Sequence, residues 1–232
     1  MNKFAIARSI IALPSKVCAV LMITVLVSCQ TIETIPNQAA RPTMDARRIE
    51  KSITYGDSTI FLQSRRRGIK TNDLMIMGKD SVPRYLCHNP YFITDFCISR
   101  RGILYYSEAG RDYGYAVGTR GHEFRLKQID LKTVPEKVKS LLPDKTFSEP
   151  QRLELNHNQK LLCFADHFGK LRAISLATGR EMKIDLDGID PDKIQGLYLS
   201  DDKRSFIAGV NTGTTESGAF IWKNRKFPLP TH

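Results

Sequence analysis

Short apolar stretches separated by polar turns dominate the chain from about residue 53 to its end. Many of the stretches contain β-branched or aromatic residues, and the positions between them are rich in Gly, Asp and Asn. This pattern is typical of β-strands joined by tight turns. The sequence therefore predicts an all-β domain over residues 51–232.

The strand-like stretches recur at intervals, which indicates an internal repeat. Three segments, at residues 96–106, 153–164 and 197–208, each consist of an apolar run, a polar turn and a second apolar run. A weaker fourth copy lies at residues 54–62. The four turns begin at positions 54, 99, 156 and 200, so they are 45, 57 and 44 residues apart.

A second landmark keeps the same register. Residues 126–133 align with residues 171–178 at an offset of 45. The longer spacing of 57 is therefore explained by 12 extra residues between Tyr106 and Leu126. Two landmarks that agree once a single insertion is located predict a repeat unit of about 45 residues built from hairpins.

The turns at residues 99–102 and 200–203, Ser-Arg-Arg-Gly and Ser-Asp-Asp-Lys, resemble degenerate forms of a turn found in the blades of WD40-like and TolB-like β-propellers. The resemblance implies about four blade-like antiparallel β units over residues 53–229, and it assigns no residue a chemical role. Four units leave open a closed ring, an open array and an assembly that needs a partner. An antiparallel β-sandwich is the alternative fold.

One short helix is predicted at residues 133–142. Thr133 and Glu136 have the spacing of a capping box, in which each side chain binds the backbone amide of the other. The apolar residues at positions 134, 138, 141 and 142 would share one helical face, and Pro143 would end the helix. Because two turns are not stable alone, this face is expected to pack on a sheet.

A basic and then strongly apolar segment precedes the domain. Lys3, Arg8 and Lys16 come first, and residues 17–27 follow with Thr24 as their one polar residue. An apolar run this short, after a basic start, is typical of a secretory signal rather than of a membrane-spanning helix.

The end of this segment, Leu26-Val27-Ser28-Cys29, resembles the processing site of bacterial lipoproteins. Ser28 is small, as a signal peptidase requires beside the scissile bond, and Cys29 supplies the thiol that accepts diacylglycerol. The resemblance implies a cleaved signal peptide at residues 1–28 and a lipidated N-terminus at Cys29. Two or three acyl chains on one residue suffice for stable membrane anchoring. The alternative is an ordinary cleaved signal peptide that ends beside a cysteine.

Residues 29–50 contain Pro36, Asn37 and Pro42 but no periodic apolar positions, which predicts a lipidated, flexible tether. Gln30 follows the lipidated cysteine, and the likeness to Gram-negative lipoproteins implies the outer membrane, because Asp is absent from that position. We therefore expect a protein anchored at the outer membrane that faces the periplasm.

The chain is basic, with 35 Lys and Arg against 24 Asp and Glu. Removal of the signal takes away three basic residues and no acid, so the remaining 204 residues carry a net charge of +8. Outside the cytoplasm, such a surface favours anionic lipid headgroups, lipopolysaccharide phosphates or an acidic envelope protein over nucleic acid. A solvated basic face without a specific partner is the alternative.

In blade-like units, the loops between second and third strands emerge on one face, and the sequence places them at residues 63–70, 107–124, 166–170 and 211–218. Guanidinium groups bind phosphate or carboxylate through paired hydrogen bonds, and tyrosines add contact area. This face is predicted to bind an anionic partner, with ordinary solvated loops as the alternative. Its candidate binding residues are Arg65, Arg66, Arg67, Lys70, Arg111, Tyr113, Tyr115, Arg120 and Lys170.

Three cysteines remain in the domain. An oxidising compartment allows a disulfide between Cys87 and Cys97. Cys163 lies within an apolar run and is predicted to be a buried free thiol. The cysteines lack the spacing of a metal site, and the sequence predicts no cofactor.

Signs of catalysis are weak. Asp166 and His167 are adjacent and could do acid–base work, but the sequence identifies no nucleophile beside them. Residues 185–192 carry carboxylates at alternate positions, yet they depart from the EF-hand pattern and predict a turn. Phe220 and Trp222 alternate with Ile221 as in a half-buried strand, which predicts core positions.

These features favour a binding or scaffold module tethered in the cell envelope, without catalysis. A hydrolase or lyase on a propeller-like fold is one alternative, but no cluster of carboxylates and histidine recurs at equivalent repeat positions. A structural envelope protein that assembles through exposed sheet edges is another.

Overall fold

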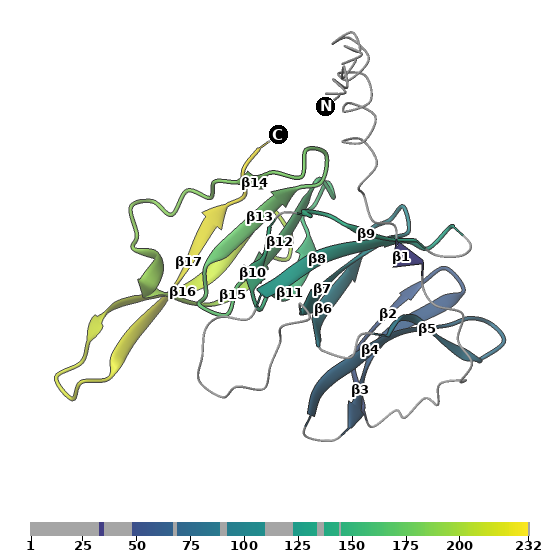
Figure 1. The fold of residues 1–232 in the computed structure, drawn as a ribbon. Coiled ribbons are helices and arrows are strands. Elements are labelled where there is room, and N and C mark those ends of the chain that lie inside the picture. The colour runs from purple at the N-terminus through teal and green to yellow at the C-terminus, as the bar shows by residue number, and fades with distance from the viewer. Residues whose placement is uncertain are drawn as a thin grey trace, which may run out of the picture. The chain divides into compact units, whose positions relative to one another are not determined.

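The computed structural model describes residues 33–34, 48–66, 69–88, 92–109, 123–133, 137–143 and 145–231. The described elements are strands in four antiparallel sheets and a short 3-10 helix (Figure 1). The prediction of an all-β chain is therefore confirmed.

The first sheet has four strands in sequence order, β2-β3-β4-β5. Along β2, half-buried Ile53 and Tyr55 alternate with exposed Ser52 and Thr54, as expected of a strand with one face on a core. Its strands are β2 (Ile49–Tyr55), β3 (Ser58–Arg66), β4 (Ile69–Met77) and β5 (Pro83–His88).

The second sheet follows the order β6-β7-β8-β9, with β1 beside β9 and β10 beside β8. It carries the longer connection between second and third strands, because β7 ends at residue 109 and β8 begins at residue 123. Its strands are β6 (Ile93–Ile98), β7 (Ile103–Ala109), β8 (Glu123–Asp130), β9 (Lys137–Ser140), β1 (Glu33–Thr34) and β10 (Phe147–Ser148).

The helix predicted at residues 133–142 is wrong, because residues 137–140 form strand β9. Val138 is buried opposite Ile129 of β8, while the two flanking lysines are exposed. The edge of β8 supplies backbone hydrogen bonds that a two-turn helix would have had to form alone. Over so short a segment, the same apolar residues fit both the period of a helix and the period of a strand. Pairing with β8 favours the strand.

The third sheet has four strands, β11-β12-β13-β14, and the fourth has three, β15-β16-β17. A short 3-10 helix, η2 (Pro191–Lys193), leads directly into β15. The strands are β11 (Gln151–Leu155), β12 (Leu161–Ala165), β13 (Leu171–Ser175), β14 (Glu181–Met182), β15 (Ile194–Leu199), β16 (Ser205–Thr214) and β17 (Phe220–Pro228).

The predicted repeat corresponds to these sheets. All four repeat turns join the first strand of a sheet to its second: β2 to β3, β6 to β7, β11 to β12 and β15 to β16. The second landmark marks the third strands β8 and β13. The blade-like organisation and its register are therefore confirmed.

Hydrophobic cores join consecutive sheets. One cluster holds Leu62 and Leu74 of the first sheet together with Phe96 and Tyr106 of the second. Another joins the second and third sheets around Leu126 and Phe164, and a further one joins the third and fourth. Every sheet is thus held to the next in sequence, in the manner of successive propeller blades.

The repeat turns also contact one another. Gly102 has a φ of +83°, and a Cβ there would lie 2.6 Å from the Tyr55 hydroxyl of the preceding repeat, so glycine is required. The backbone N–H of Arg100 donates to Gln159 Oε1 at 2.8 Å, which links the second and third sheets. The N–H of His157 donates to the Lys203 carbonyl at 2.9 Å and links the third to the fourth.

Candidate functional site

A cavity with an excess of basic side chains lies beside the third sheet, and we call it the basic pocket. Its volume is about 750 Å³, within the range of small-molecule sites. Part of its wall is apolar, formed by Leu142, Leu171, Met182, Ile184, Leu186, Pro191 and Ile194. Its charged lining consists of Lys145, Lys170, Arg172, Arg180 and Lys183, with Glu181 as the acid.

Arg172 of β13 is the most enclosed of these cations, with 18% of its side chain exposed. Its Nη1 donates to Glu181 Oε1 at 2.5 Å, and its Nη2 donates to Asp166 Oδ2 at 3.3 Å. The guanidinium also lies over the Phe147 ring, 5.8 Å from the centroid. These contacts fix the guanidinium in one orientation.

The Nε of Arg172 is buried and has no hydrogen-bond partner among the described residues. A buried N–H without an acceptor costs free energy comparable to a lost hydrogen bond. The Nε of Arg172 is therefore the one buried side-chain donor of this cluster that the described residues leave unsatisfied.

Lys145 completes the inner charge cluster. Its Nζ donates to Glu181 Oε2 and lies 5.6 Å from the centroid of the Phe147 ring. Burial raises the pKa of Glu181, but hydrogen bonds and charges from Arg172 and Lys145 outweigh it and hold the pKa below its usual value. Glu181 is therefore ionised at neutral pH and offsets one of the cations.

The other three cations of the pocket, Lys170, Arg180 and Lys183, are exposed. They make no ion pair with any residue that the structure describes. Five basic side chains thus face two carboxylates, those of Glu181 and Asp166, so the pocket has an excess of positive charge. Such a site attracts anions, and its apolar wall can bury a hydrocarbon group as well.

The turn before β13 shapes one side of the pocket. Asp166 is buried, and its Oδ1 accepts from the backbone N–H groups of Phe168 at 3.1 Å and Lys170 at 2.9 Å. Gly169 has a φ of +77°, and a Cβ there would lie 2.9 Å from the Ile194 carbonyl oxygen. Asp166 is therefore a turn-forming residue, while the neighbouring His167 is exposed and lies 3.5 Å from Glu149. The side chains of Asp166 and His167 therefore contact different partners.

Of the candidates that the sequence singled out for the binding face, Lys170 lies in the basic pocket. Residues 65, 66 and 70 belong to strands, since β3 runs to Arg66 and β4 begins at Ile69, so the loop predicted at 63–70 is nearly all strand. The side chains of Arg65, Arg66 and Lys70, and the whole of Arg67, Arg111, Tyr113, Tyr115 and Arg120, lie outside the described residues. Their common face stays a prediction.

Sequence reasoning missed Arg172, Lys145, Arg180 and Lys183. A signal for Arg172 was available, because it lies within the short run of residues 171–175, where its neighbours Leu171 and Ala173 are buried. A basic residue inside such a run needs a partner of opposite charge. The other three come from separate connections, and nothing in the linear sequence brings them together.

A second cavity, of about 710 Å³, lies where the first strands of the sheets meet. It is lined by Lys51 of β2, Asp95 of β6, Glu154 of β11 and Lys203 of the turn between β15 and β16. Lys51 Nζ lies 2.6 Å from Asp95, and Lys203 Nζ lies 3.6 Å from Glu154. Arg100, Arg152 and Asp201 line it as well, so its four cations face three carboxylates and the excess of positive charge is smaller than in the basic pocket.

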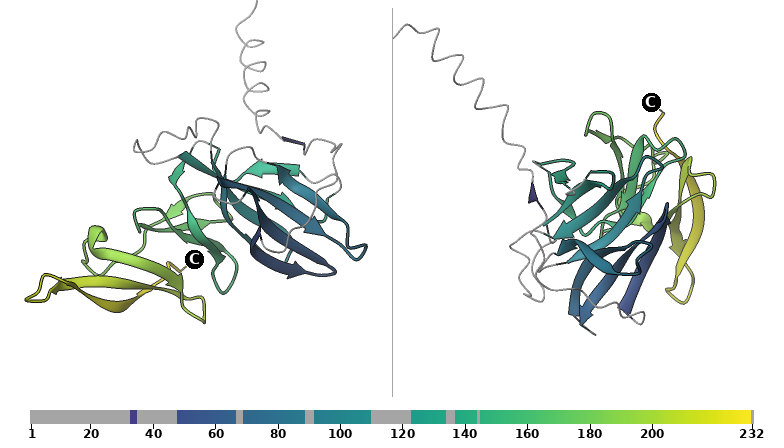
Figure 2. Two further views of the ribbon diagram at one scale, coloured as in Figure 1. Left: turned by 90° about the horizontal axis from the view of Figure 1, so that it is seen from below. Right: turned by 90° about the vertical axis from the view of Figure 1, so that its right-hand side faces the viewer.

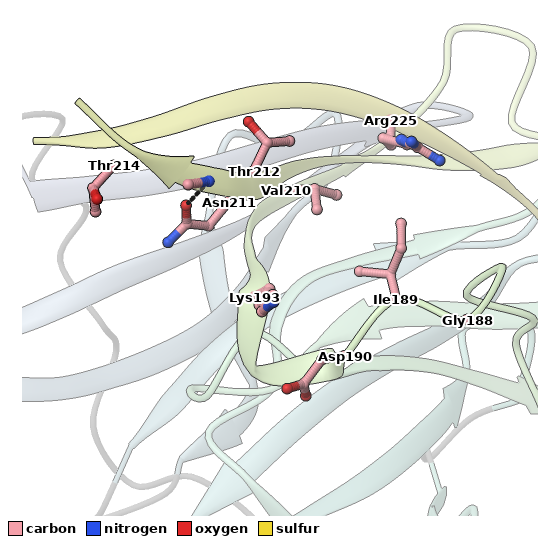
Figure 3. Close-up of a pocket in the computed structure, with 10 residues that line it drawn as sticks. Gly188, Ile189, Asp190, Lys193, Val210, Asn211, Thr212, Thr214 and Arg225 are labelled. Carbon is pink, nitrogen blue, oxygen red and sulfur yellow. Dashed lines mark hydrogen bonds between the residues drawn. The ribbon is translucent and has the colours of Figure 1, made fainter. Parts of the chain in front are cut away.

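A third cavity, of about 580 Å³, lies between residues 188–193 and the β16–β17 hairpin. Figure 3 shows Asn211, Thr212 and Thr214 on its hairpin side and Lys193 across from them, with Asn211 Oδ1 accepting the N–H of Gly213 at 3.0 Å. Its lining holds two cations, Lys193 and Arg225, and so lacks the cluster that distinguishes the basic pocket.

The cysteines do not form a reactive or cross-linked site. Cys87 and Cys97 are free thiols, so the disulfide that the sequence allows is not formed in this structure. Cys87 packs against the core between the first and second sheets, whereas Cys97 belongs to the core between the second and third. Burial raises the pKa of Cys87 and of Cys163 to about 12, and that of Cys97 further, which keeps all three as unreactive thiols. Cys163 is buried and free as predicted.

Within the described ranges, no group of three or more His, Cys, Asp or Glu is placed to hold a metal ion. Residues 185–190 contain a turn at residues 187–188 and lead into η2, and Asp185 and Asp190 each accept a backbone N–H two residues ahead. A search of the same ranges finds no helix with the length and apolar character needed to cross a membrane.

No model of a known protein family matches the chain, and no curated protein sequence matches it. Among solved structures, the chain is similar to the β-propeller domain of the Trilobed protease from Pyrococcus furiosus, which has an open velcro topology. The identity is 12% and the TM-score 0.52, over 77% of this chain and 56% of that one. An oligogalacturonate lyase in complex with manganese is similar at 11% identity and a TM-score of 0.48, over 75% of this chain and 46% of that one.

The chain thus spans about half the length of these structures. At such low identity, the likeness to the protease domain shows the fold alone. The chain has a β-propeller-like fold made of four consecutive antiparallel sheets.

Proposed function

We propose that this protein is a lipoprotein of the bacterial cell envelope, anchored by acyl chains on Cys29, which acts as a binding module for an anionic ligand. The anchor is supported by the processing site at residues 26–29 after a basic and apolar segment. A binding role is supported by a β scaffold that carries a charged pocket.

The observation that carries the proposal is the basic pocket. Arg172 is held in place by Glu181 and Asp166 with its Nε unpaired, and Lys170, Arg180 and Lys183 surround it without ion pairs in the described structure. Arginine and lysine in this arrangement bind phosphate or carboxylate through charge-assisted hydrogen bonds.

The apolar wall narrows the ligand class. Met182, Ile184 and Leu186 are half-buried and line the same cavity as the cations. A ligand with both an anionic group and a hydrocarbon group would satisfy both walls, whereas a purely polar anion would leave the apolar wall in water. The ligand is therefore a phosphate-bearing amphiphile, such as an anionic lipid or the lipid part of lipopolysaccharide.

The anchor and the pocket are tested separately. Metabolic labelling with palmitate is expected to label the protein, and Cys29→Ala is expected to abolish the label and release the protein from membranes. An unlabelled protein, or a Cys29→Ala protein that fractionates unchanged, would refute the anchor without affecting the pocket.

For the pocket, the purified lipoprotein is placed in neutral detergent micelles doped with phosphatidylglycerol or phosphatidylcholine, and retained lipid is counted by native mass spectrometry. Retention of phosphatidylglycerol is expected to fall with Lys170→Glu/Arg180→Glu/Lys183→Glu and with added salt. A matched control is Lys132→Glu/Lys137→Glu/Lys139→Glu, which changes the charge equally at exposed positions of the second sheet. Equal loss in both triple variants would mean that net charge alone, and no pocket, attracts the lipid.

A further inference from the structure

The fourth sheet exposes an unusual amount of apolar surface. Six large apolar side chains of the described residues are exposed, and four of them, Tyr198, Phe220, Ile221 and Trp222, belong to this sheet. Phe220 is 63% exposed, Ile221 39% and Trp222 40%. The core positions predicted for Phe220 and Trp222 are therefore wrong, and both faces of β17 at this end are open to solvent.

The exposure follows from where the core ends. At the other end of the same pair of strands, Phe227 lies opposite Phe206, and both are buried in the core shared with the third sheet. Figure 1 shows β16 and β17 as one long hairpin, and its start at Phe220 belongs to no described core cluster. Consecutive exposed aromatic and aliphatic residues on a strand mark an interaction site or an aggregation liability.

The outer edge of β17 is also open. The first and third sheets have four strands each, whereas the fourth has three, in the order β15-β16-β17. Within the described residues no strand pairs with that edge, and Figure 2 shows the hairpin with β16 as the neighbour of β17. A nine-residue edge presents unpaired backbone N–H and C=O groups to any extended segment that fits it.

The side chains along this edge change from apolar to basic from one end of β17 to the other. Because strands alternate, Phe220, Trp222 and Lys226 lie on one face of β17, and Ile221, Lys223 and Arg225 lie on the other. Both faces are therefore apolar near residue 220 and basic towards residue 226. The rings of Phe220 and Trp222 meet edge to face with centroids 6.3 Å apart, which forms one continuous apolar surface.

The cations on this edge are available to a partner. Arg225 lies 3.6 Å from Asp187 and Lys226 lies 3.7 Å from Asp202, and all four side chains are more than half exposed. Such exposed pairs contribute little to stability and exchange readily. Lys223 makes no ion pair with a described residue.

We propose that the free edge of β17 binds an extended segment of a partner protein, which adds a fourth strand to this sheet. All the strand pairs in the described part of the chain are antiparallel, so the incoming segment is taken to be antiparallel too. Its first half then lies beside Lys226, Arg225 and Lys223 and is acidic, and its second half lies beside Trp222 and Phe220 and is apolar. This surface shares no residue with the basic pocket, so a result that refutes one of the two sites does not refute the other.

Trp222 is the one tryptophan of the chain, and its emission therefore reports on this edge. The probe is a synthetic peptide with an acidic N-terminal half and an apolar C-terminal half of β-branched residues, added to the full lipoprotein in neutral detergent. A blue shift that saturates is expected, because the incoming strand covers the indole. A peptide of the same composition in reverse order is expected to bind at least about tenfold more weakly, because its acidic half would lie beside the aromatic side chains and its apolar half beside the cations.

Two variants and two modified peptides separate strand pairing from general attraction. Lys223→Glu/Arg225→Glu is expected to lose the peptide and to bind a version with lysines in place of the acids, whereas the control Lys137→Glu/Lys139→Glu is expected to behave as the parent. Peptides methylated on alternate backbone amides, in the two possible registers, are expected to differ, because only one set of N–H groups faces β17.

Three results would each overturn the proposal. Equal binding of forward and reversed peptides, or of both methylated registers, would show that no ordered strand forms. An emission shift that depends on protein concentration without peptide, together with a sedimenting dimer, would make a second copy of the chain the occupant. A shift with phosphatidylglycerol vesicles but not with peptide would make the surface a membrane contact.

Discussion

Asp95 joins three of the four sheets at one point, and its replacement tests how the sheets hold together. Its Oδ1 lies 2.6 Å from Lys51 Nζ of β2, and its Oδ2 accepts the backbone N–H of Leu153 in β11 at 2.8 Å. Oδ1 also accepts the N–H of Phe96. We expect Asp95→Ala to destabilise the fold by removing all three contacts at once.

The magnitude follows from burial. Leu153 is fully buried, so its N–H would be left without a partner, which costs about 1–3 kcal/mol. The ion pair adds less, about 0.5 kcal/mol, because a third of the Lys51 side chain is exposed. We therefore expect Asp95→Ala to lower the free energy of unfolding by about 2–4 kcal/mol, and Lys51→Met by less than about 1 kcal/mol.

Urea denaturation followed by far-UV circular dichroism measures both changes, and the double variant gives the coupling between the two side chains. Asp95→Asn is the matched control, because its amide oxygen can still accept the Leu153 N–H while the charge is lost. It should recover most of the lost stability. If Lys51→Met costs as much as Asp95→Ala, the ion pair and not the buried hydrogen bond holds these strands together, and the argument is wrong.

Three further results are expected. Gly169→Ala should lower the free energy of unfolding by about 1–3 kcal/mol in thermal denaturation, because the residue has a positive φ and its Cβ would press on the Ile194 carbonyl; an unchanged midpoint would contradict this close approach. The folded-state pKa of Glu181 is lowered, so its stabilising effect is present above its unfolded pKa of about 4.3 and is lost as the pH falls through the folded value. The stability difference between the protein and Glu181→Gln, measured in urea, should therefore shrink on acidification, and a difference that grows would reverse the sign. Finally, maleimide should add to three thiols of the mature lipoprotein in denaturant without reductant, whereas a Cys87–Cys97 disulfide would leave one.

The sheets could be predicted because each of their turns depends on residues that are close together in the sequence. The segment Asn156 to Gln159 shows why: Asn156 Oδ1 accepts the N–H of Leu161, and Gln159 adopts a φ of +58°. Such turns need particular residues at particular positions, so their spacing survives even where the strands between them diverge. Residues 137–140 pair with β8, the strand that directly precedes them, but the apolar positions of so short a segment fit a helix as well as a strand, so the pairing could not be predicted from the segment alone.

The basic pocket was beyond a local reading for a different reason. Lys145 lies between β9 and β10 of the second sheet, Arg172 lies in β13 and Lys183 follows β14, so their meeting depends on how the third sheet packs against the segment that precedes β10. The misplacement of Trp222 has the opposite origin. Its alternation with Ile221 correctly indicates a strand, but alternation reports the direction of side chains and not whether another layer covers them.

The proposed anchor changes what the basic pocket must achieve. Strand β1 (Glu33–Thr34) pairs with β9, so four residues, 29–32, separate the proposed attachment point from the second sheet, a reach of about 13 Å when extended. Lipids of the same leaflet are then present at an effective concentration in the millimolar range, so a site with weak intrinsic affinity is filled. On this proposal the pocket has to discriminate between headgroups rather than bind them tightly, and exposed cations such as Lys170 and Lys183 beside Arg172 would serve that discrimination. A soluble form without the anchor should accordingly keep the preference for anionic over zwitterionic lipid while losing most of its occupancy.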